Sequence, residues 1–197
     1  WNLGASLAFN IPIAEKTLKV NAEYYYTTFE NQAVIDFDSD PNKIIISDLD
    51  GDSYSHVVQV DATYPFFKGF TLTAAYRMNH IRCSYGGVMM EKPLTSSYKA
   101  LATASYETPD KNWQFDVTYQ MNGGGRMPNP GEAKMWQEEY DAFGLLSAQA
   151  TRRFKHFEIY LGGENLTGCT QENAIISANN PWSDTFDPTM IYAPIDG

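Results

Sequence analysis

Apolar and polar residues alternate one by one through most of this chain. Between residues 98 and 107, Tyr98, Ala100 and Ala102 occupy every second position, while Lys99 and Thr103 belong to the opposite set. Because successive side chains of a strand point to opposite faces, this period of two predicts strands with one apolar face. About eight such strands are predicted, near residues 1–11, 17–26, 58–64, 70–79, 98–107, 113–122, 143–154 and 157–166. The second strand is expected to continue to about Phe37.

The connections between these strands alternate between short and long. Tight turns are predicted near residues 14, 68, 110 and 155, and long polar loops at about 38–55, 80–96, 123–141 and 168–197. Transmembrane β-barrels have short turns at one rim and long loops at the other, whereas a soluble sandwich gives no reason for this segregation. The predicted fold is therefore all-β, an antiparallel transmembrane β-barrel segment. A soluble β-sandwich ligand-binding module and a small passive outer-membrane barrel are the alternatives.

The composition is compatible with such a barrel. No run approaches the roughly 18 consecutive apolar residues of a membrane helix, but a transmembrane strand needs only about 9 to 11 residues, of which every second one faces lipid. Aromatic residues make up 14% of the chain. That content suits the aromatic girdles that flank the apolar band of a transmembrane barrel.

Charge and motif content exclude several classes of function. The formal net charge of −10 makes nucleic acid an unsuitable partner, because phosphates need basic neutralisation. His56, His80 and His156 are scattered, and no phosphate loop, dinucleotide fingerprint or Gly-x-Ser-x-Gly motif is present. The sequence therefore predicts neither an enzyme nor a bound cofactor.

One loop is rich in carboxylates. Asp48, Asp50 and Asp52 are weak candidates for holding Ca²⁺, which prefers oxygen ligands, but their spacing does not fit an EF-hand. A solvated acidic loop accounts equally well for them, so no metal site is predicted. The two cysteines, Cys83 and Cys169, are far apart, and their spacing does not decide whether they pair.

The last part of the chain carries recognisable motifs. Gly162–Thr167 reads Gly-Gly-Glu-Asn-Leu-Thr, Asn173–Ile176 and Asn180–Trp182 follow it, and the Phe-Asp-x-x-Met-x-x-x-Pro ending spans Phe186 to Pro194. In this order, these motifs resemble the C-terminal end of a TonB-dependent outer-membrane receptor of the Bacteroidetes type. Similar segments upstream, including Asn122–Pro128, extend the resemblance over nearly the whole chain.

The resemblance implies a barrel of about 22 strands around an N-terminal plug. Residues 1–197 would form a single partial domain, the C-terminal part of that barrel, lacking the plug and the final strand. It implies an outer-membrane receptor of a Gram-negative bacterium that actively takes up a scarce nutrient such as an iron chelate, corrinoid, glycan or peptide. Its implied partners are the plug and remaining strands of the same receptor, TonB through the plug, outer-membrane lipid and lipopolysaccharide, and the nutrient itself.

Two sets of site residues are predicted. Alternation places one set on the inward face, lining the lumen towards the plug: Lys19, Glu23, Asp61, Arg77, Lys99, Asp116 and Gln120. The second set lies in the long loops and is predicted to contact ligand: Arg126, Trp136, Tyr140 and Trp182. The alternative for the three aromatic residues is packing of the loops against each other, and the alternative for Arg126 is a solvated side chain in a flexible loop. Arg126 would offer a bidentate fork beside a flexible Gly-rich segment. Arg152 falls on the apolar face near a turn, where its guanidinium is expected to reach towards lipid headgroups.

Overall fold

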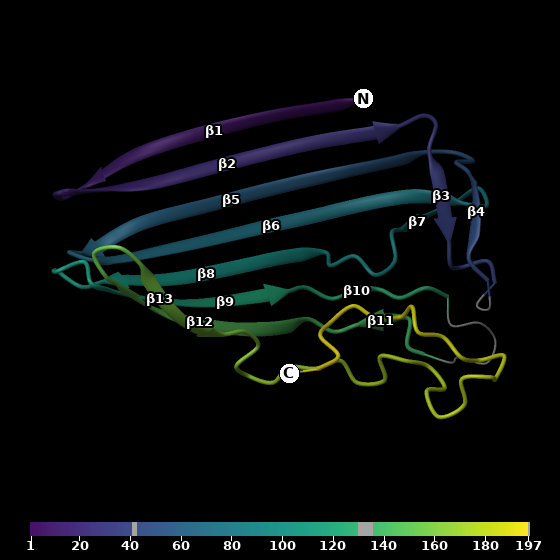
Figure 1. Cartoon of the computed structure of the whole chain (residues 1–197). Coiled ribbons are helices and arrows are strands. Elements are labelled where there is room, and N and C mark those ends of the chain that lie inside the picture. Colours follow the sequence, from purple (N-terminus) through teal and green to yellow (C-terminus); the bar gives the residue numbers. More distant parts are fainter. Residues whose placement is uncertain (41–42, 130–135, 197) are drawn as a thin grey trace.

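The computed structural model describes residues 1–40, 43–129 and 136–196, and its regular structure in these ranges consists of strands (Figure 1). Eight long strands follow one another in an antiparallel sheet, each beside its predecessor. They are β1 (Asn2–Ile13), β2 (Lys16–Phe29), β5 (Ser53–Phe67), β6 (Phe70–Tyr85), β8 (Tyr98–Glu107), β9 (Trp113–Asn122), β12 (Phe143–Arg153) and β13 (Glu158–Gly163). The predicted number of strands and their antiparallel order are confirmed. No helix in the described ranges is long and apolar enough to span a membrane.

Short and long connections lie at opposite ends of the sheet, as Figure 1 shows. The tight turns join β1 to β2, β5 to β6, β8 to β9 and β12 to β13 at one end. In the turn after β5, Gly69 adopts φ +85°, and a Cβ there would lie 2.1 Å from the carbonyl oxygen of Glu107. Only glycine fits this position, because both the backbone angle and the space exclude a side chain.

The register gives the sheet one polar and one apolar face. Cross-strand partners share a face, so a row of polar residues crosses six strands through Lys19, Thr63, Thr73, Thr103, Thr118 and Ser147. The next row lies on the opposite face and is apolar: Phe9, Val20, Ala62, Ala74, Ala102, Tyr119 and Leu146. The apolar side chains are largely exposed; Leu7, for example, retains 60% of its accessible surface. Contact with water is unfavourable for such a face, and an apolar surrounding such as lipid would stabilise it.

Aromatic side chains flank the centre of the apolar face. Phe70, Tyr106 and Phe115 form a row near the tight turns. Tyr76 and Tyr98 stack near the long loops, with ring centroids 5.8 Å apart. Alanines occupy the positions between these rows on β8, so the order is that of two aromatic girdles around an apolar band.

The strands extend further into the predicted loops than alternation indicates. Ser53–Ser55 belong to β5 and His80–Tyr85 to β6, although both segments were predicted as loop, and β7 (Val88–Glu91) pairs with β6. β2 ends at Phe29 rather than continuing to Phe37. Beyond the apolar band the strands pack against the long loops, where polar Ser53 and Ser84 are buried as well as Cys83 and Tyr85, so pairing continues without a regular alternation of apolar and polar residues.

Two small sheets lie in the long loops. Ala33–Asp36 forms β3, which pairs with β4 (Ile45–Asp48) inside the region predicted as the end of the second strand and the first loop. β10 (Gly125–Arg126) pairs with β11 (Glu139–Tyr140) inside the predicted 123–141 loop. The buried hydrophobic residues of the described chain gather in and near these loops: Val34, Cys83, Tyr85, Met127, Tyr140 and Met190.

Candidate functional site

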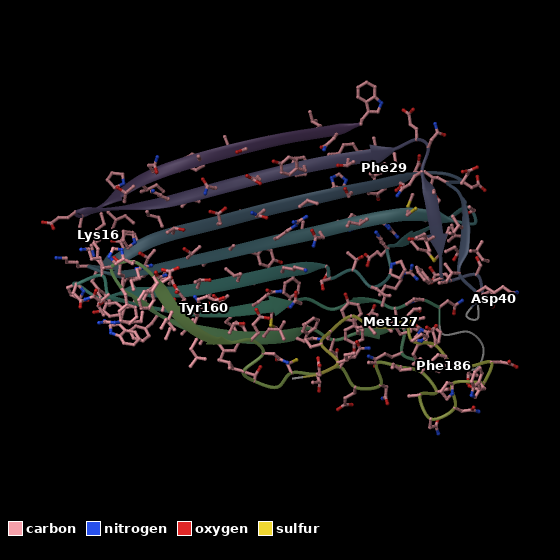
Figure 2. All side chains as sticks on the ribbon, viewed as in Figure 1. Lys16, Phe29, Asp40, Met127, Tyr160 and Phe186 are labelled. Atoms are coloured by element: carbon pink, nitrogen blue, oxygen red, sulfur yellow. The ribbon has the colours of Figure 1, made fainter. Side chains whose placement is uncertain are left out.

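The long loops form a rim at the end of the sheet where Asp40, Met127 and Phe186 lie (Figure 2), and a partly buried ion pair joins two of them. Arg126 of β10 donates from Nη1 to Asp38 Oδ1 over 2.6 Å and from Nη2 to Asp38 Oδ2 over 2.9 Å. Its Nε donates to the carbonyl oxygen of Glu91 over 2.8 Å. The backbone N–H of Asn129 also donates to Asp38 Oδ1. The fork that the sequence offers to a ligand is therefore held by Asp38 in this structure.

The Asp38 carboxylate is positioned by a compact turn after β3. Asp36 Oδ1 accepts the backbone N–H groups of Asp38, over 2.7 Å, and Ser39, over 3.0 Å, and the Ser39 hydroxyl donates to Oδ2. Burial raises the pKa of Asp36, but these hydrogen bonds and the Arg126 charge outweigh burial and hold it below its usual 3.8. The turn is thus stabilised by an ionised Asp36.

The predicted glycine-rich segment packs against protein. A Cβ on Gly123 would lie 2.5 Å from the Tyr98 ring, and one on Gly125 would lie 2.4 Å from the carbonyl oxygen of Thr95. These glycines allow close approach between the loop and the top of β8.

A second buried cluster attaches the final loop to the rim. Tyr140 stacks on Tyr192 with ring centroids 4.2 Å apart, and Met127 and Met190 complete the buried set. Gln171 fixes the chain around Tyr192, because its Oε1 accepts the backbone N–H of Tyr192 over 2.9 Å and its Nε2 donates to the Met190 carbonyl over 2.7 Å. The segment from Met127 to Tyr140 and the final loop, which are far apart in sequence, are therefore packed against each other.

The Gly162–Thr167 motif makes the turn from β13 into this loop. Asn165 adopts a left-handed φ of 48°, which asparagine tolerates better than most residues. Its side chain accepts the backbone N–H of Cys169 and donates to the Cys169 carbonyl, both over 2.9 Å. The asparagine of the motif therefore closes the turn that starts the final loop.

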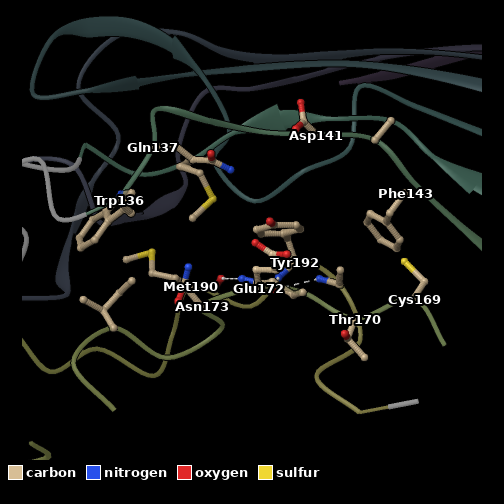
Figure 3. Close-up of a pocket in the computed structure, with 15 residues that line it drawn as sticks. Trp136, Gln137, Asp141, Phe143, Cys169, Thr170, Glu172, Asn173, Met190 and Tyr192 are labelled. Carbon is tan, nitrogen blue, oxygen red and sulfur yellow. Dashed lines mark hydrogen bonds between the residues drawn. The ribbon is translucent and has the colours of Figure 1, made fainter. Parts of the chain in front are cut away.

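A pocket of about 530 Å³ lies between the final loop and the segment around β11 (Figure 3). Aromatic side chains of Trp136, Phe143 and Tyr192 line it. So do polar side chains that make no hydrogen bond or ion pair within the described residues: Gln137, Asp141, Thr170, Glu172 and Asn173.

The electrostatics of this pocket are negative. No Lys or Arg is found among the described lining residues, whereas Asp141 and Glu172 both line it. Burial, reinforced by these two carboxylates and by Tyr140, raises the pKa of Tyr192, so its hydroxyl stays protonated and available as a donor. The lining combines flat rings, carboxylate and amide acceptors, and hydroxyl donors.

The predicted ligand residues occupy different positions in the rim. Trp136 lines the pocket and donates from Nε1 to the carbonyl oxygen of Pro128 over 2.7 Å. Tyr140 is buried beneath it, with 3% of its surface exposed, while Trp182 is 94% exposed and lies outside the pocket lining. The pocket residues that sequence reasoning did not single out, such as Glu172 and Tyr192, lie in a loop without periodicity, so no local signal marked them.

The seven predicted lumen residues share one face. Residues paired across neighbouring strands lie on the same face. Lys19 is paired with Thr63, and Asp61 with Asn21. Glu23 is paired with Gln59, which is paired in turn with Arg77. Arg77 pairs with Lys99, and Asp116 and Gln120 continue the same face on β9. The structure thus groups all seven on the polar side of the sheet.

The remaining candidates do not form a site in this structure. Within residues 1–40, 43–129 and 136–196, no three His, Cys, Asp or Glu side chains group so as to hold a metal ion, and this includes Asp48, Asp50 and Asp52. Cys83 and Cys169 are both free thiols. Cys83 is buried beside Tyr85, whereas Cys169 lines the pocket.

Comparison with known proteins places this geometry in a family. Residues 1–166 match the family model described as TonB dependent receptor-like, beta-barrel. The whole chain superposes on 26% of the ferric-catecholate import receptor Fiu of E. coli K12 in its closed form, with a TM-score of 0.56 and 11% identity. That likeness shows the fold, and the chain spans about a quarter of that receptor's length. No curated protein matches the chain.

The matched family consists of transport receptors of the Gram-negative outer membrane rather than enzymes. The antiparallel strands, their two different faces and the segregated turns agree with the family model. The chain therefore belongs to the TonB-dependent receptor β-barrel family and forms a segment of such a barrel.

Proposed function

We propose that this chain forms part of the wall and the outer rim of a receptor that actively transports a scarce nutrient across the outer membrane. The family assignment and the two-faced sheet support this proposal. The apolar face contacts outer-membrane lipid and lipopolysaccharide, because only that face can replace water by hydrocarbon. The partners are the plug and remaining strands of the same receptor, and TonB, which acts through the plug.

The polar face lines the lumen in this proposal. Lys19, Glu23 and Asp61 lie on it with Arg77 and Lys99, so opposite charges are interspersed along one surface. Such a surface stays hydrated and can form hydrogen bonds with a plug without an apolar contact that would resist movement. Asp116 and Gln120 extend it along β9.

The pocket of the final loop receives the nutrient, and its lining favours a neutral, hydroxyl-rich ligand such as an oligosaccharide. The carrying observation is the combination of three aromatic side chains with unpaired carboxylate, amide and hydroxyl groups and no described basic residue. Fiu imports ferric catecholates, but Asp141 and Glu172 would repel an anionic chelate of that kind. Hydroxyl groups can donate to these carboxylates, and sugar rings can pack on the aromatic faces.

The test measures binding to the purified full receptor. A panel of neutral oligosaccharides and a ferric dihydroxybenzoate chelate are titrated by calorimetry. We expect an oligosaccharide to bind and Glu172→Ala to weaken it by about 10- to 100-fold, the cost of one hydrogen bond to a charged group. Asp184→Ala removes an exposed carboxylate of the same loop outside the pocket and is the matched control. Binding of the ferric chelate with no oligosaccharide bound, or equal effects of the two variants, would contradict the assignment.

A further inference from the structure

Arg152 occupies an unusual place on the apolar face. It lies on β12 next to the tight turn, opposite Trp113 of β9 and Ile159 of β13. Its guanidinium carbon is 5.0 Å from the centroid of the Trp113 ring and 5.4 Å from that of Phe154. Two aromatic rings therefore hold one cation on a face that is otherwise free of charge along its central rows.

No carboxylate of the described residues lies within 4.0 Å of the Arg152 guanidinium. The neighbouring Arg153 points to the opposite face, where its Nη1 lies 2.7 Å from Glu107 and its Nε 3.7 Å from Glu158. Asp110 of the adjacent turn interacts electrostatically with Arg152 at longer range, without forming an ion pair. The two adjacent arginines thus differ: Arg153 is paired with carboxylates, whereas Arg152 contacts two aromatic rings.

The surroundings of Arg152 are those of a membrane interface. Phe154 and Phe157 stack across the turn with centroids 4.6 Å apart, and Trp113 stacks on Phe115 at 5.9 Å. Phe157 is 59% exposed and Trp113 40% exposed. Lys155 and His156 are exposed at the tip of the same turn. Amphipathic rings collect where hydrocarbon meets headgroups, and basic side chains reach into the headgroup layer from there.

We propose that Arg152, positioned by Trp113 and Phe154, binds the phosphate of a phospholipid headgroup in the leaflet next to the tight turns. This inference rests on the proposed function, which sets the apolar face against lipid. The rings cover part of the guanidinium, and its remaining N–H groups are a fork that suits phosphate oxygens. A lipid supplies both parts of the match, since its acyl chains cover the apolar rows and its phosphate meets the cation.

The test counts lipids retained by the full receptor. The receptor is purified in detergent, incubated with phosphatidylglycerol, and examined by native mass spectrometry. We expect Arg152→Gln to reduce retention of this lipid by about 10-fold, since one charge-assisted interaction is lost. Arg77→Gln removes an equal charge from the polar face and should retain the lipid. Equal retention by wild type and Arg152→Gln would overturn the proposal, and so would equal loss in both variants.

A second variant and a second probe separate the remaining explanations. Trp113→Leu keeps the charge but removes one ring, so we expect intermediate retention; unchanged retention would show that the rings do not position the cation. Inorganic phosphate should not displace the lipid at equal concentration, and displacement would make this a simple anion site and overturn a lipid site.

Membrane contact is measured independently of the headgroup. Quenching by a neutral phosphatidylcholine brominated on its acyl chains, taken as the difference between wild type and Trp113→Phe, reports whether this face lies in lipid. Quenching combined with equal lipid retention by wild type and Arg152→Gln would overturn only the phosphate site. No quenching would overturn both this proposal and the proposed function.

Discussion

The wall, made of the eight long strands, and the rim, made of the long loops, are held together in different ways. In the wall, each long strand pairs with the long strands before and after it in the chain, and many apolar side chains stay exposed. In the rim, the buried hydrophobic residues come from separate loops, and the Arg126–Asp38 pair joins positions 88 residues apart. The wall depends on continuous backbone pairing, whereas the rim depends on a small number of side-chain contacts. The two regions should therefore respond differently to single substitutions.

Breaking the wall should have the largest effect. Ala102 lies on β8, which pairs with β6 on one side and β9 on the other. Ala102→Pro removes a backbone N–H from a strand that is paired on both sides, a position where proline is not tolerated. We expect the full receptor to lose its heat-modifiable migration in electrophoresis. Ala102→Val is the control, because a β-branched residue suits a lipid-facing strand position. Normal migration of the proline variant would show that backbone pairing does not limit the wall.

Breaking the rim should have a smaller and local effect. Asp38→Asn leaves Arg126 without its charge partner, and since Arg126 retains 21% side-chain exposure we expect a cost of about 2 to 3 kcal/mol. Hydrogen exchange should accelerate by roughly 30- to 100-fold in residues 33–39 and 125–129, with β5 and β6 unchanged. Asp48→Asn changes an exposed carboxylate of the same region and should have little effect. Acceleration that spreads through the main sheet would refute the separation of rim and wall.

Acid should loosen the turn after β3 by a still smaller amount. The folded pKa of Asp36 lies below 3.8, so its contribution is present above that value and is lost as the pH falls through the lower folded pKa. We expect exchange around residues 36–39, corrected for its intrinsic pH dependence, to rise as the pH drops below about 4. Asp36→Asn should show faster exchange already at neutral pH and no such rise. A rise of equal size in that variant would assign the acid sensitivity to another group.

Much of the wall could be predicted because the information is local. The alternation from Tyr98 to Tyr106 specifies the faces of β8 directly, and the turn at Gly69 can be located from its own residues. The ends of β5 and β6 could not be predicted in this way. Residues such as Tyr54 and His80 are half-buried where the strands pack against the loops, and polar and apolar residues are mixed there, so no hydrophobic period marks them as strand.

The rim could be predicted only in outline. Arg126 was identifiable as a donor near the loops, but nothing near it in sequence indicates that Asp38 holds it. Trp136 was identified by residue type, whereas Glu172 and Tyr192 carry no pattern that distinguishes them from other loop residues. The closing motif was recognisable in sequence, yet its role became clear only from the two hydrogen bonds of Asn165 to Cys169.

The sequence by itself determined the all-β fold class, the number of long strands, which face of each strand is apolar, and which ends carry the tight turns. These follow from a period of two and from turn chemistry, both of which act between residues close in the chain. The tertiary structure alone decided the ion pair between two loops, the pocket beneath the final loop, and the aromatic support of Arg152. Each of these depends on side chains brought together across the sheet or between loops. A periodic pattern among neighbouring residues does not predict contacts between residues far apart in sequence.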